Sequence, residues 1–126
     1  MAIVGVGTDI VEIQRIRSSF DKFGDKFADR ILSDAEKATK TYQVQPVHYL
    51  AKRFAAKEAI MKALGTGLAR GVRFDDFSIL NNADGKPYVE IEGEGKALLE
   101  RLGINHIHIS ISDEKNQAIA FVVAES

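Results

Sequence analysis

PVHYLAKRFAAKEAIMKALGTG, residues 46–67, is the most informative segment of the chain. Proline is favoured at the start of a helix and glycine just past its end, so Pro46 and Gly65 predict one long helix over 47–64. On a helix that turns by about 100° per residue, two non-polar surfaces emerge. The first is a stripe of large side chains, formed by Leu50, Phe54, Met61 and Leu64. The second is a flatter seam that lets another backbone approach closely, formed by Ala51, Ala55, Ala59 and Ala63.

Three charged residues lie close to these surfaces. Lys57 falls inside the apolar stripe, where a charge must be paired, bind a metal or extend to the surface. Glu58 falls at the border between the two surfaces, and Lys62 lies one turn further on. Glu58 and Lys62 therefore have two interpretations. They could form an ordinary helix ion pair worth roughly 0.3 kcal/mol, or they could belong to a functional site.

Asp9 is the second candidate for chemistry. Residues 3–9 predict a short buried strand containing two glycines, and a helix is expected to follow at once. Asp9 and Glu12 fit a capping box at the start of that helix. Asp9 could equally be a metal ligand, because magnesium is typically held by one or two carboxylates with water and phosphate oxygens completing its shell. Asp9 and Glu58 could supply both carboxylates, although local sequence does not show that they meet.

Two further segments have alternative interpretations. Gly65-Thr66-Gly67 invites a phosphate-loop interpretation, but it follows a helix C-terminus, where the dipole is negative. A glycine cap is the better structural role, and the two roles can coexist. His108 lies on the polar face of an alternating strand over 105–112, where an ordinary surface histidine is the basic expectation.

The remaining pattern predicts an α+β fold with an antiparallel sheet packed against the long helix and shorter helices. The helix after Asp9 is expected to kink or break at Gly24, and Ser33 and Glu36 fit a capping box that starts another short helix. The later elements are strands at 77–80 and 88–91 joined by a turn, a helix at 94–102, and paired strands at 105–112 and 118–124. The whole chain, residues 1–126, reads as a single domain.

Composition narrows the function. The chain has 126 residues, of which 45% are hydrophobic. Its net charge is only −1, and the lack of an overall positive charge argues against nucleic acid or an anionic membrane as partner. There is no cysteine, which excludes disulfides, thiolate catalysis and zinc–cysteine sites and suits a reducing cytoplasm. We expect neither a membrane span nor a signal peptide. Basic residues slightly outnumber acidic ones along 14–30, which usually indicates only a solvated face.

Taken together, the motifs resemble the short holo-acyl-carrier-protein synthases, which are small bacterial 4'-phosphopantetheinyl transferases. The resemblance rests on GTDIVE (7–12), RFAAKEA (53–59), KALGTG (62–67), GKP (85–87) and HISIS (108–112). It covers nearly the whole chain, and the two leading motifs at this separation are highly specific.

The resemblance implies a Mg²⁺-dependent transfer of phosphopantetheine from coenzyme A to a serine of an acidic acyl carrier protein, in support of fatty acid biosynthesis. It implies that Asp9 and Glu58 hold the metal and that Lys62 contacts the pyrophosphate and takes part in catalysis. The coenzyme A contacts it implies are Arg53, Lys62, Gly65, Thr66, Gly67, Lys86, Pro87 and His108. The carrier-docking residues it implies are Arg15, Lys22, Lys26 and Arg30. The serine proton could pass to Glu58, to a metal-bound water or to Lys62.

The resemblance also implies a homotrimer whose sites lie between subunits. Two other classes of function remain possible on the residues alone: a module that binds coenzyme A or a nucleotide without turnover, and a purely structural oligomerisation domain.

Overall fold

The computed structural model describes residues 1–65 and 71–126. The chain forms these elements in order: β1 (Ile3–Glu12), α1 (Ile13–Phe23), α2 (Asp25–Ile31), α3 (Asp34–Lys37), α4 (Lys40–Val44), α5 (Pro46–Leu64), the 3-10 turn η1 (Phe74–Asp76), β2 (Phe77–Asn81), β3 (Pro87–Ile91), α6 (Gly93–Leu102), β4 (His106–Asp113) and β5 (Gln117–Glu125). The predicted long helix is therefore confirmed as α5, with Pro46 at its start and Gly65 as its left-handed C-cap.

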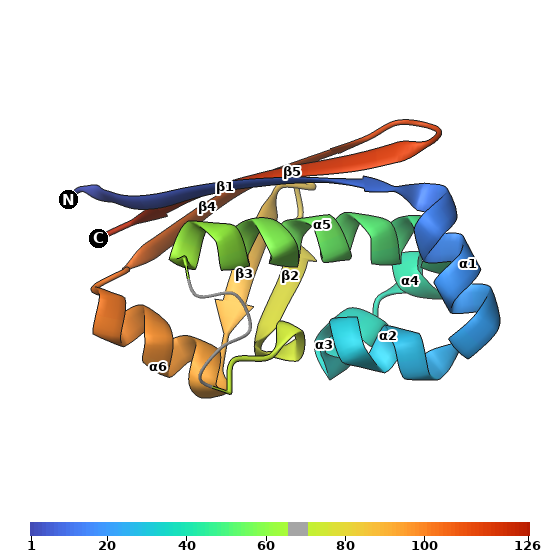
Figure 1. The fold of residues 1–126 in the computed structure, drawn as a ribbon, viewed down its shortest axis with the longest axis horizontal. Helices are drawn as coiled ribbons and strands as arrows, with labels where there is room; N and C mark the ends of the chain where they lie inside the picture. Colours follow the sequence, from blue (N-terminus) through green and yellow to red (C-terminus); the bar gives the residue numbers. More distant parts are fainter. Residues whose placement is uncertain (66–70) are drawn as a thin grey trace.

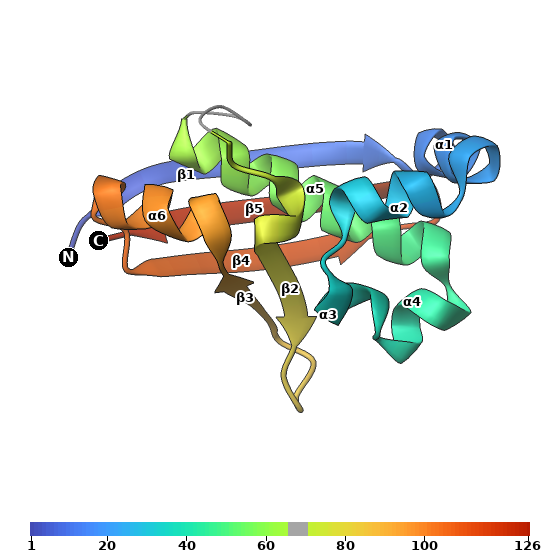
Figure 2. The same ribbon diagram turned by 90° about the horizontal axis from the view of Figure 1, so that it is seen from below.

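Helix α5 lies against one face of a three-stranded antiparallel sheet with the order β1-β5-β4 (Figure 1). A separate two-stranded antiparallel sheet, β2-β3, packs against other parts of the helix, with α1 to α4 on one side of it and α6 on the other (Figure 2). The predicted pairs β2-β3 and β4-β5 are confirmed. The single sheet of the prediction is in fact two sheets, and both contribute to the α+β fold.

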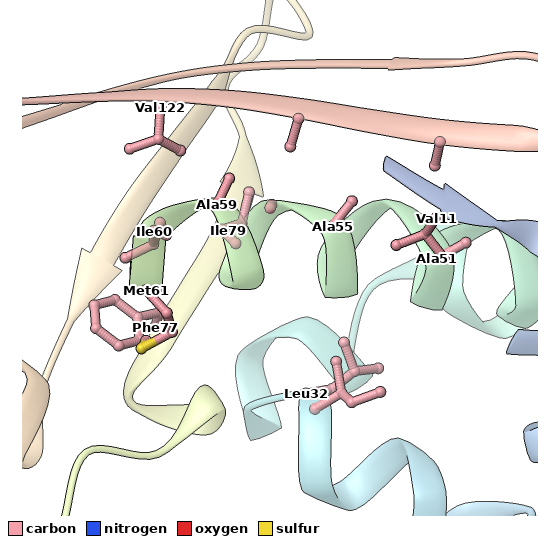
Figure 3. Close-up of a cluster of buried hydrophobic side chains, with 14 of the residues drawn as sticks. Val11, Leu32, Ala51, Ala55, Ala59, Ile60, Met61, Phe77, Ile79 and Val122 are labelled. Carbon is pink, nitrogen blue, oxygen red and sulfur yellow. The ribbon is translucent and has the colours of Figure 1, made fainter. Parts of the chain in front are cut away.

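Strand β1 packs closely against the alanine seam of α5. A Cβ placed on Gly5 would lie 1.9 Å from the carbonyl oxygen of Ala63, and one on Gly7 would lie 1.9 Å from that of Ala59. Glycine is the one residue that permits this approach of two backbones. In Figure 3 the labelled alanines of α5 point toward the strand that carries Val122. Glycine on the strand and alanine on the helix together bring β1 directly onto α5.

The stripe of large side chains on α5 is buried by the same chain. Leu50, Met61 and Leu64 lie in the core, where Met61 packs near Phe77 of β2 (Figure 3). Helices α1 and α2 and strand β2 pack against α5 in addition to the three-stranded sheet, so neither of the two non-polar surfaces of the helix is left open to solvent. The exposed apolar surface lies instead on the far face of the three-stranded sheet.

Two expectations at the N-terminal end also change. Strand β1 runs three residues further than predicted, to Glu12, and only its face toward α5 is buried. Asp9 is therefore paired with Ala120 in mid-strand and does not cap a helix. The N-cap of α1 is Glu12, which makes no side-chain capping bond. The break at Gly24 and the capping box of Ser33 and Glu36 are confirmed.

Candidate active site

A cavity of ≈ 290 Å³ at the junction of β1, α1 and α5 contains both candidate metal ligands, Asp9 and Glu58. We call it the carboxylate pocket. Arg15 also lines it, and its apolar wall includes Ile16 and Phe54. The structure thus brings together two carboxylates that are 49 residues apart in the sequence, which local sequence did not show.

Asp9 reaches this pocket because of the alternation along β1. Gly7, Asp9 and Val11 lie on the face of the strand that is turned toward α5, since neighbouring side chains of a strand point to opposite faces. The missing side chain at Gly7 lets the helix come close, and Asp9 is the next residue on the same face. The glycine spacing that builds the fold also places the carboxylate.

Lys62 is bound to β1. Its Nζ lies 3.1 Å from Asp9 Oδ1 and donates a hydrogen bond to the backbone oxygen of Thr8 at 2.9 Å. The Lys62 side chain is 54% exposed, whereas that of Asp9 is 16% exposed. In the described part of the chain the ion-pair partner of Lys62 is therefore Asp9. The helix pair with Glu58, expected as one alternative, does not form as a salt bridge there.

The electrostatics of the pocket favour a cation. Burial raises the pKa of Glu58 above its ordinary value, the Asp9 carboxylate raises it further, and Lys62 acts in the opposite direction. The two carboxylates repel each other in this half-buried pocket, and a cation bound between them would relieve that repulsion.

The residues fit magnesium as the source of that charge. Among residues 1–65 and 71–126 no cluster of three or more histidine, aspartate or glutamate ligands is present, as zinc or a fully protein-held calcium would require. Magnesium is commonly bound through one or two carboxylates and keeps its other positions for water and substrate phosphate. Asp9 and Glu58 supply that number of carboxylates in an open pocket.

A second cavity, of ≈ 590 Å³, lies between α5 and the β2-β3 sheet, and we call it the Arg53 pocket. Arg53 is buried, donates from Nε to the backbone oxygen of Ile79 at 3.0 Å, and donates from an amino group to Asn81 Oδ1 at 2.8 Å. Its guanidinium stacks 4.4 Å from the ring centre of Tyr49. Among the described residues the buried Tyr49 hydroxyl has no hydrogen-bond partner. Thr39, Thr41, Lys52, Leu80 and Tyr88 complete the lining.

The other residues expected to contact coenzyme A are spread over the molecule. Lys86 and Pro87 lie where the β2-β3 turn enters β3, and Gly65 is the C-cap of α5. Thr66 and Gly67 lie outside the described residues. His108 is on the exposed face of β4, with Nε2 3.1 Å from Glu125 Oε1, and this contact lowers the pKa of Glu125. One chain does not bring His108 to the Arg53 pocket, because α5 packs on the opposite face of that sheet.

Comparison with known proteins identifies the family. A model of the 4'-phosphopantetheinyl transferase superfamily matches residues 5–122. The chain belongs to this superfamily. The resemblance drawn from GTDIVE and RFAAKEA is thereby confirmed.

Named relatives match this chain over nearly its full length. The holo-[acyl-carrier-protein] synthase of Vibrio parahaemolyticus is 51% identical over 126 residues, with 100% of each chain covered. The crystal structure of the synthase from Neisseria meningitidis matches with a TM-score of 0.92 and 45% identity, covering 99% of this chain and 100% of that one. The Helicobacter pylori synthase in complex with coenzyme A matches with a TM-score of 0.82 and 32% identity, covering 95% and 99%.

The four candidate carrier-docking residues of this superfamily member are all exposed. Arg15 lies on α1 and lines the carboxylate pocket, and Lys22 stacks 5.3 Å from the ring of its neighbour Phe23. Lys26 and Arg30 lie on α2 beyond the break at Gly24. The face therefore spans two helices and reaches the carboxylate pocket through Arg15. No helix in the described ranges is long and apolar enough to cross a membrane.

The sequence analysis missed one buried ion pair of this transferase. Glu36 is completely buried and forms a salt bridge of 2.6 Å with Lys57, whose side chain is also completely buried. Burial lowers the pKa of Lys57, and Glu36 opposes that shift. Lys57 also donates to the backbone oxygen of Ile31. The sequence showed that Lys57 needed a partner, but the capping box accounted for Glu36 and hid its second role.

Proposed function

We propose that the chain uses Asp9, Glu58 and Lys62 to transfer the 4'-phosphopantetheine group of coenzyme A to a serine of an apo acyl carrier protein. The observation that carries this assignment is the meeting of both carboxylates in one pocket, with the Lys62 amine bound to one of them. Relatives that match the whole chain are named holo-[acyl-carrier-protein] synthases, and a solved relative is described in complex with coenzyme A.

The reaction is a phosphoryl transfer. The serine hydroxyl oxygen forms a bond to the β-phosphorus of coenzyme A, the bond from that phosphorus to the bridging oxygen breaks, and adenosine 3',5'-bisphosphate leaves. Negative charge builds on the phosphoryl and leaving oxygens, where a fixed positive charge lowers the barrier. Magnesium held by Asp9 and Glu58 would supply such charge by polarising the phosphate oxygens. Lys62, at the open side of Asp9, would supply a second positive charge.

The serine must also lose its proton. Glu58 is one acceptor that the pocket offers. The amine of Lys62 is the other acceptor among these side chains.

Coenzyme A would extend from the carboxylate pocket to Arg53 and His108, which would bind its 3'-phosphate end. Gly65, Thr66, Gly67, Lys86 and Pro87 would line the nucleotide. Arg53 and His108 lie on different faces of one chain, which favours a site completed by His108 of a neighbouring copy. A homotrimer with such shared sites is our proposed assembly.

The carrier protein would dock on the basic face of Arg15, Lys22, Lys26 and Arg30, because carriers are acidic and Arg15 leads into the carboxylate pocket. We place the enzyme in the cytoplasm, in support of fatty acid biosynthesis, and a chain without cysteine suits a reducing compartment.

The test is direct. The protein is incubated with coenzyme A, Mg²⁺ and an apo carrier protein, and the carrier is examined by mass spectrometry. A mass gain of one phosphopantetheine that requires Mg²⁺ is expected. Binding of coenzyme A without any gain would identify a binding module, and neither binding nor gain would leave a structural oligomerisation domain.

A further inference from the structure

The free edge of strand β2 is bonded to charged side chains in place of a third strand. Ile79 donates its backbone N–H to Glu36 Oε2 at 2.9 Å, and its carbonyl accepts from Arg53 Nε at 3.0 Å. Because β2 pairs only with β3 in the described chain, these groups would otherwise be open. Both backbone groups of Ile79 on this edge are thus bonded, the N–H to a carboxylate and the carbonyl to a guanidinium.

Glu36 links this strand edge to the central helix. Its Oε1 accepts from Lys57 Nζ at 2.6 Å and from the backbone N–H of Ser33 at 2.9 Å, while Oε2 holds Ile79. Lys57 in turn binds the last turn of α2 through Ile31. A single buried carboxylate therefore connects α3, α5 and β2, and its two oxygens accept three different donors.

The wall of the Arg53 pocket depends on this connection. Asn81 lies two residues beyond Ile79 on β2, and its Oδ1 holds the guanidinium of Arg53 at 2.8 Å. Leu80 and Tyr88 of the same hairpin also line the pocket, opposite Tyr49 and Arg53 of α5. A displacement of the β2-β3 hairpin relative to α5 would change the width of the pocket and release Arg53 from Asn81.

We propose that Glu36 and Lys57 are a positioning pair for coenzyme A binding, fixing the β2-β3 hairpin against α5 at the separation that the Arg53 pocket requires. Neither residue touches the substrate in this proposal, which rests on the proposed placement of coenzyme A at Arg53. A buried ion pair is weak support for stability, since well-packed apolar residues often replace one at no cost. Because the Glu36 carboxylate accepts hydrogen bonds from three donors on different elements, the pair instead fixes the position of the hairpin.

The test uses the double variant Glu36→Gln with Lys57→Met, which removes both charges and so leaves no unpaired charge buried. The single oxygen of the introduced amide can accept from either Ser33 or Ile79, but the NH₂ group beside it cannot accept from the other. Calorimetry of coenzyme A binding to the folded variant is expected to show a loss of affinity on the order of tenfold to a hundredfold, as for a small misplacement of binding groups. The KM for the carrier should change much less than the affinity for coenzyme A, since the exposed docking side chains of α1 and α2 are unchanged in the variant.

A second variant keeps the proposal testable if the double variant does not fold. Glu36→Asp keeps both charges and shortens the reach to Ile79 by one methylene group, and it should weaken coenzyme A binding in the same way. Leu98→Ala is the matched control, because Leu98 is a buried residue of α6, on the other side of the β2-β3 sheet from α3 (Figure 2). It should lower the melting temperature without changing the affinity for coenzyme A.

Arg53→Ala separates this inference from the proposed function. If Arg53→Ala leaves the affinity for coenzyme A intact, the placement of coenzyme A in this pocket is wrong, and the positioning role is wrong with it. If Arg53→Ala weakens binding while a folded Glu36→Asp variant binds coenzyme A like wild type, the pocket is correct and the positioning role alone is refuted.

Discussion

Glu58 lies where both burial and the neighbouring Asp9 disfavour its ionised form. Its folded-state pKa is therefore raised above the unfolded value. A group of this kind contributes stability at pH values below its unfolded pKa, and the contribution is lost as pH rises through the folded pKa. At neutral pH the metal-free protein carries a destabilising charge at the position that the proposed metal needs.

Neutralising Glu58 should therefore increase stability and decrease activity. Glu58→Gln is expected to raise the melting temperature of the metal-free protein at pH 7, and this difference should disappear below about pH 4.5, the ordinary pKa of the group. Turnover should fall on the order of a hundredfold or more. Calorimetric scans across pH, with and without Mg²⁺, provide the measurement. Asp9→Asn should lose turnover while staying folded, and full turnover in either variant would contradict the metal site.

Lys62 offers a second test at the scale of one residue. Its pair with Asp9 is half exposed, so it contributes less than about 1 kcal/mol to the free energy of unfolding. Loss of a charge at developing phosphate oxygens, by contrast, typically costs on the order of a hundredfold or more in turnover. Lys62→Met should therefore reduce kcat strongly with a shift in melting temperature of only a few degrees. Near-normal kcat would show that Lys62 serves only as the partner of Asp9. Lys115→Met, in the loop between β4 and β5, is a surface control.

The residues of the site were predictable to different degrees. Glu58 and Lys62 stand out on the helical wheel, because charge beside an apolar stripe needs a reason. Asp9 was ambiguous, because Asp9 and Glu12 fit a cap when only four residues are considered. The pairing of β1 with β5 resolves this ambiguity, because it extends the strand past Asp9. Such long-range pairing is invisible in a local window.

At the level of secondary-structure elements, the contact of β1 with α5 leaves no room for a side chain at Gly7. The atoms that a Cβ on Gly7 would meet are backbone atoms of α5, which cannot rotate away. Relief would require the strand and the helix to move apart, opening the core on both sides.

Gly7→Ala should therefore destabilise the protein by about 3 kcal/mol, at or above the upper end for overpacking. Chemical denaturation of Gly7→Ala against wild type is the measurement, and Val4→Ala on the exposed part of the same strand is the control. Because Asp9 lies two residues further on, the variant should also bind Mg²⁺ more weakly. A loss of stability below about 0.5 kcal/mol would show that β1 and α5 are less tightly apposed.

Helices α1 and α2 carry the proposed docking face. Reversing the charge of Arg15 and Lys26 to glutamate should raise the KM for the carrier by about tenfold or more at low salt, because exposed charges act mainly on the encounter of the partners. The KM for coenzyme A should rise much less, although Arg15 also lines the carboxylate pocket, and the effect on the carrier should shrink as salt is added. Steady-state kinetics with each substrate varied in turn provide the comparison. Equal effects on both KM values would indicate general damage to the enzyme.

Most elements were predictable because their signals are local. Proline and glycine bound α5, alternation defines β4, and Ser33 with Glu36 starts α3. Helix α4 was missed because its five residues, Lys40–Val44, contain no buried side chain and so no apolar period. The division into two sheets was missed because sequence patterns show strands but not which strands share a sheet.

At the scale of the whole molecule, the far face of the three-stranded sheet is unusually apolar. It exposes 55% of Val6, 58% of Ile10, 42% of Ile119 and 49% of Phe121. These residues lie on the paired strands β1 and β5, on the side of the sheet that no helix of the described chain covers (Figure 1). His108 lies on the same face, on β4. An apolar face bordered by a candidate substrate contact is expected to be covered by another copy of the chain.

The proposed trimer makes a prediction about mixtures. Glu58→Gln and His108→Ala proteins should each be inactive alone, yet mixing them under subunit exchange should restore activity at up to about a quarter of the sites. The reason is that some interfaces then combine an intact Glu58 with an intact His108. Light scattering establishes the oligomer, and mass spectrometry of mixed oligomers establishes the exchange. A monomer, or proven exchange without restored activity, would contradict the shared site.

The contacts of Glu36 and Arg53 with Ile79 have a further consequence for the unfolded and partly folded chain. An unpaired strand edge recruits strands from other molecules, and proteins commonly block such edges with charged groups. Here the blocking groups come from α3 and α5, so β2 is protected only once those helices have docked. Chains that form the β2-β3 hairpin early expose the hydrophobic segment FSIL, residues 77–80, with its edge open. Aggregation during refolding should therefore begin at this hairpin, and Glu36→Gln should promote it at concentrations where the wild-type chain stays in solution.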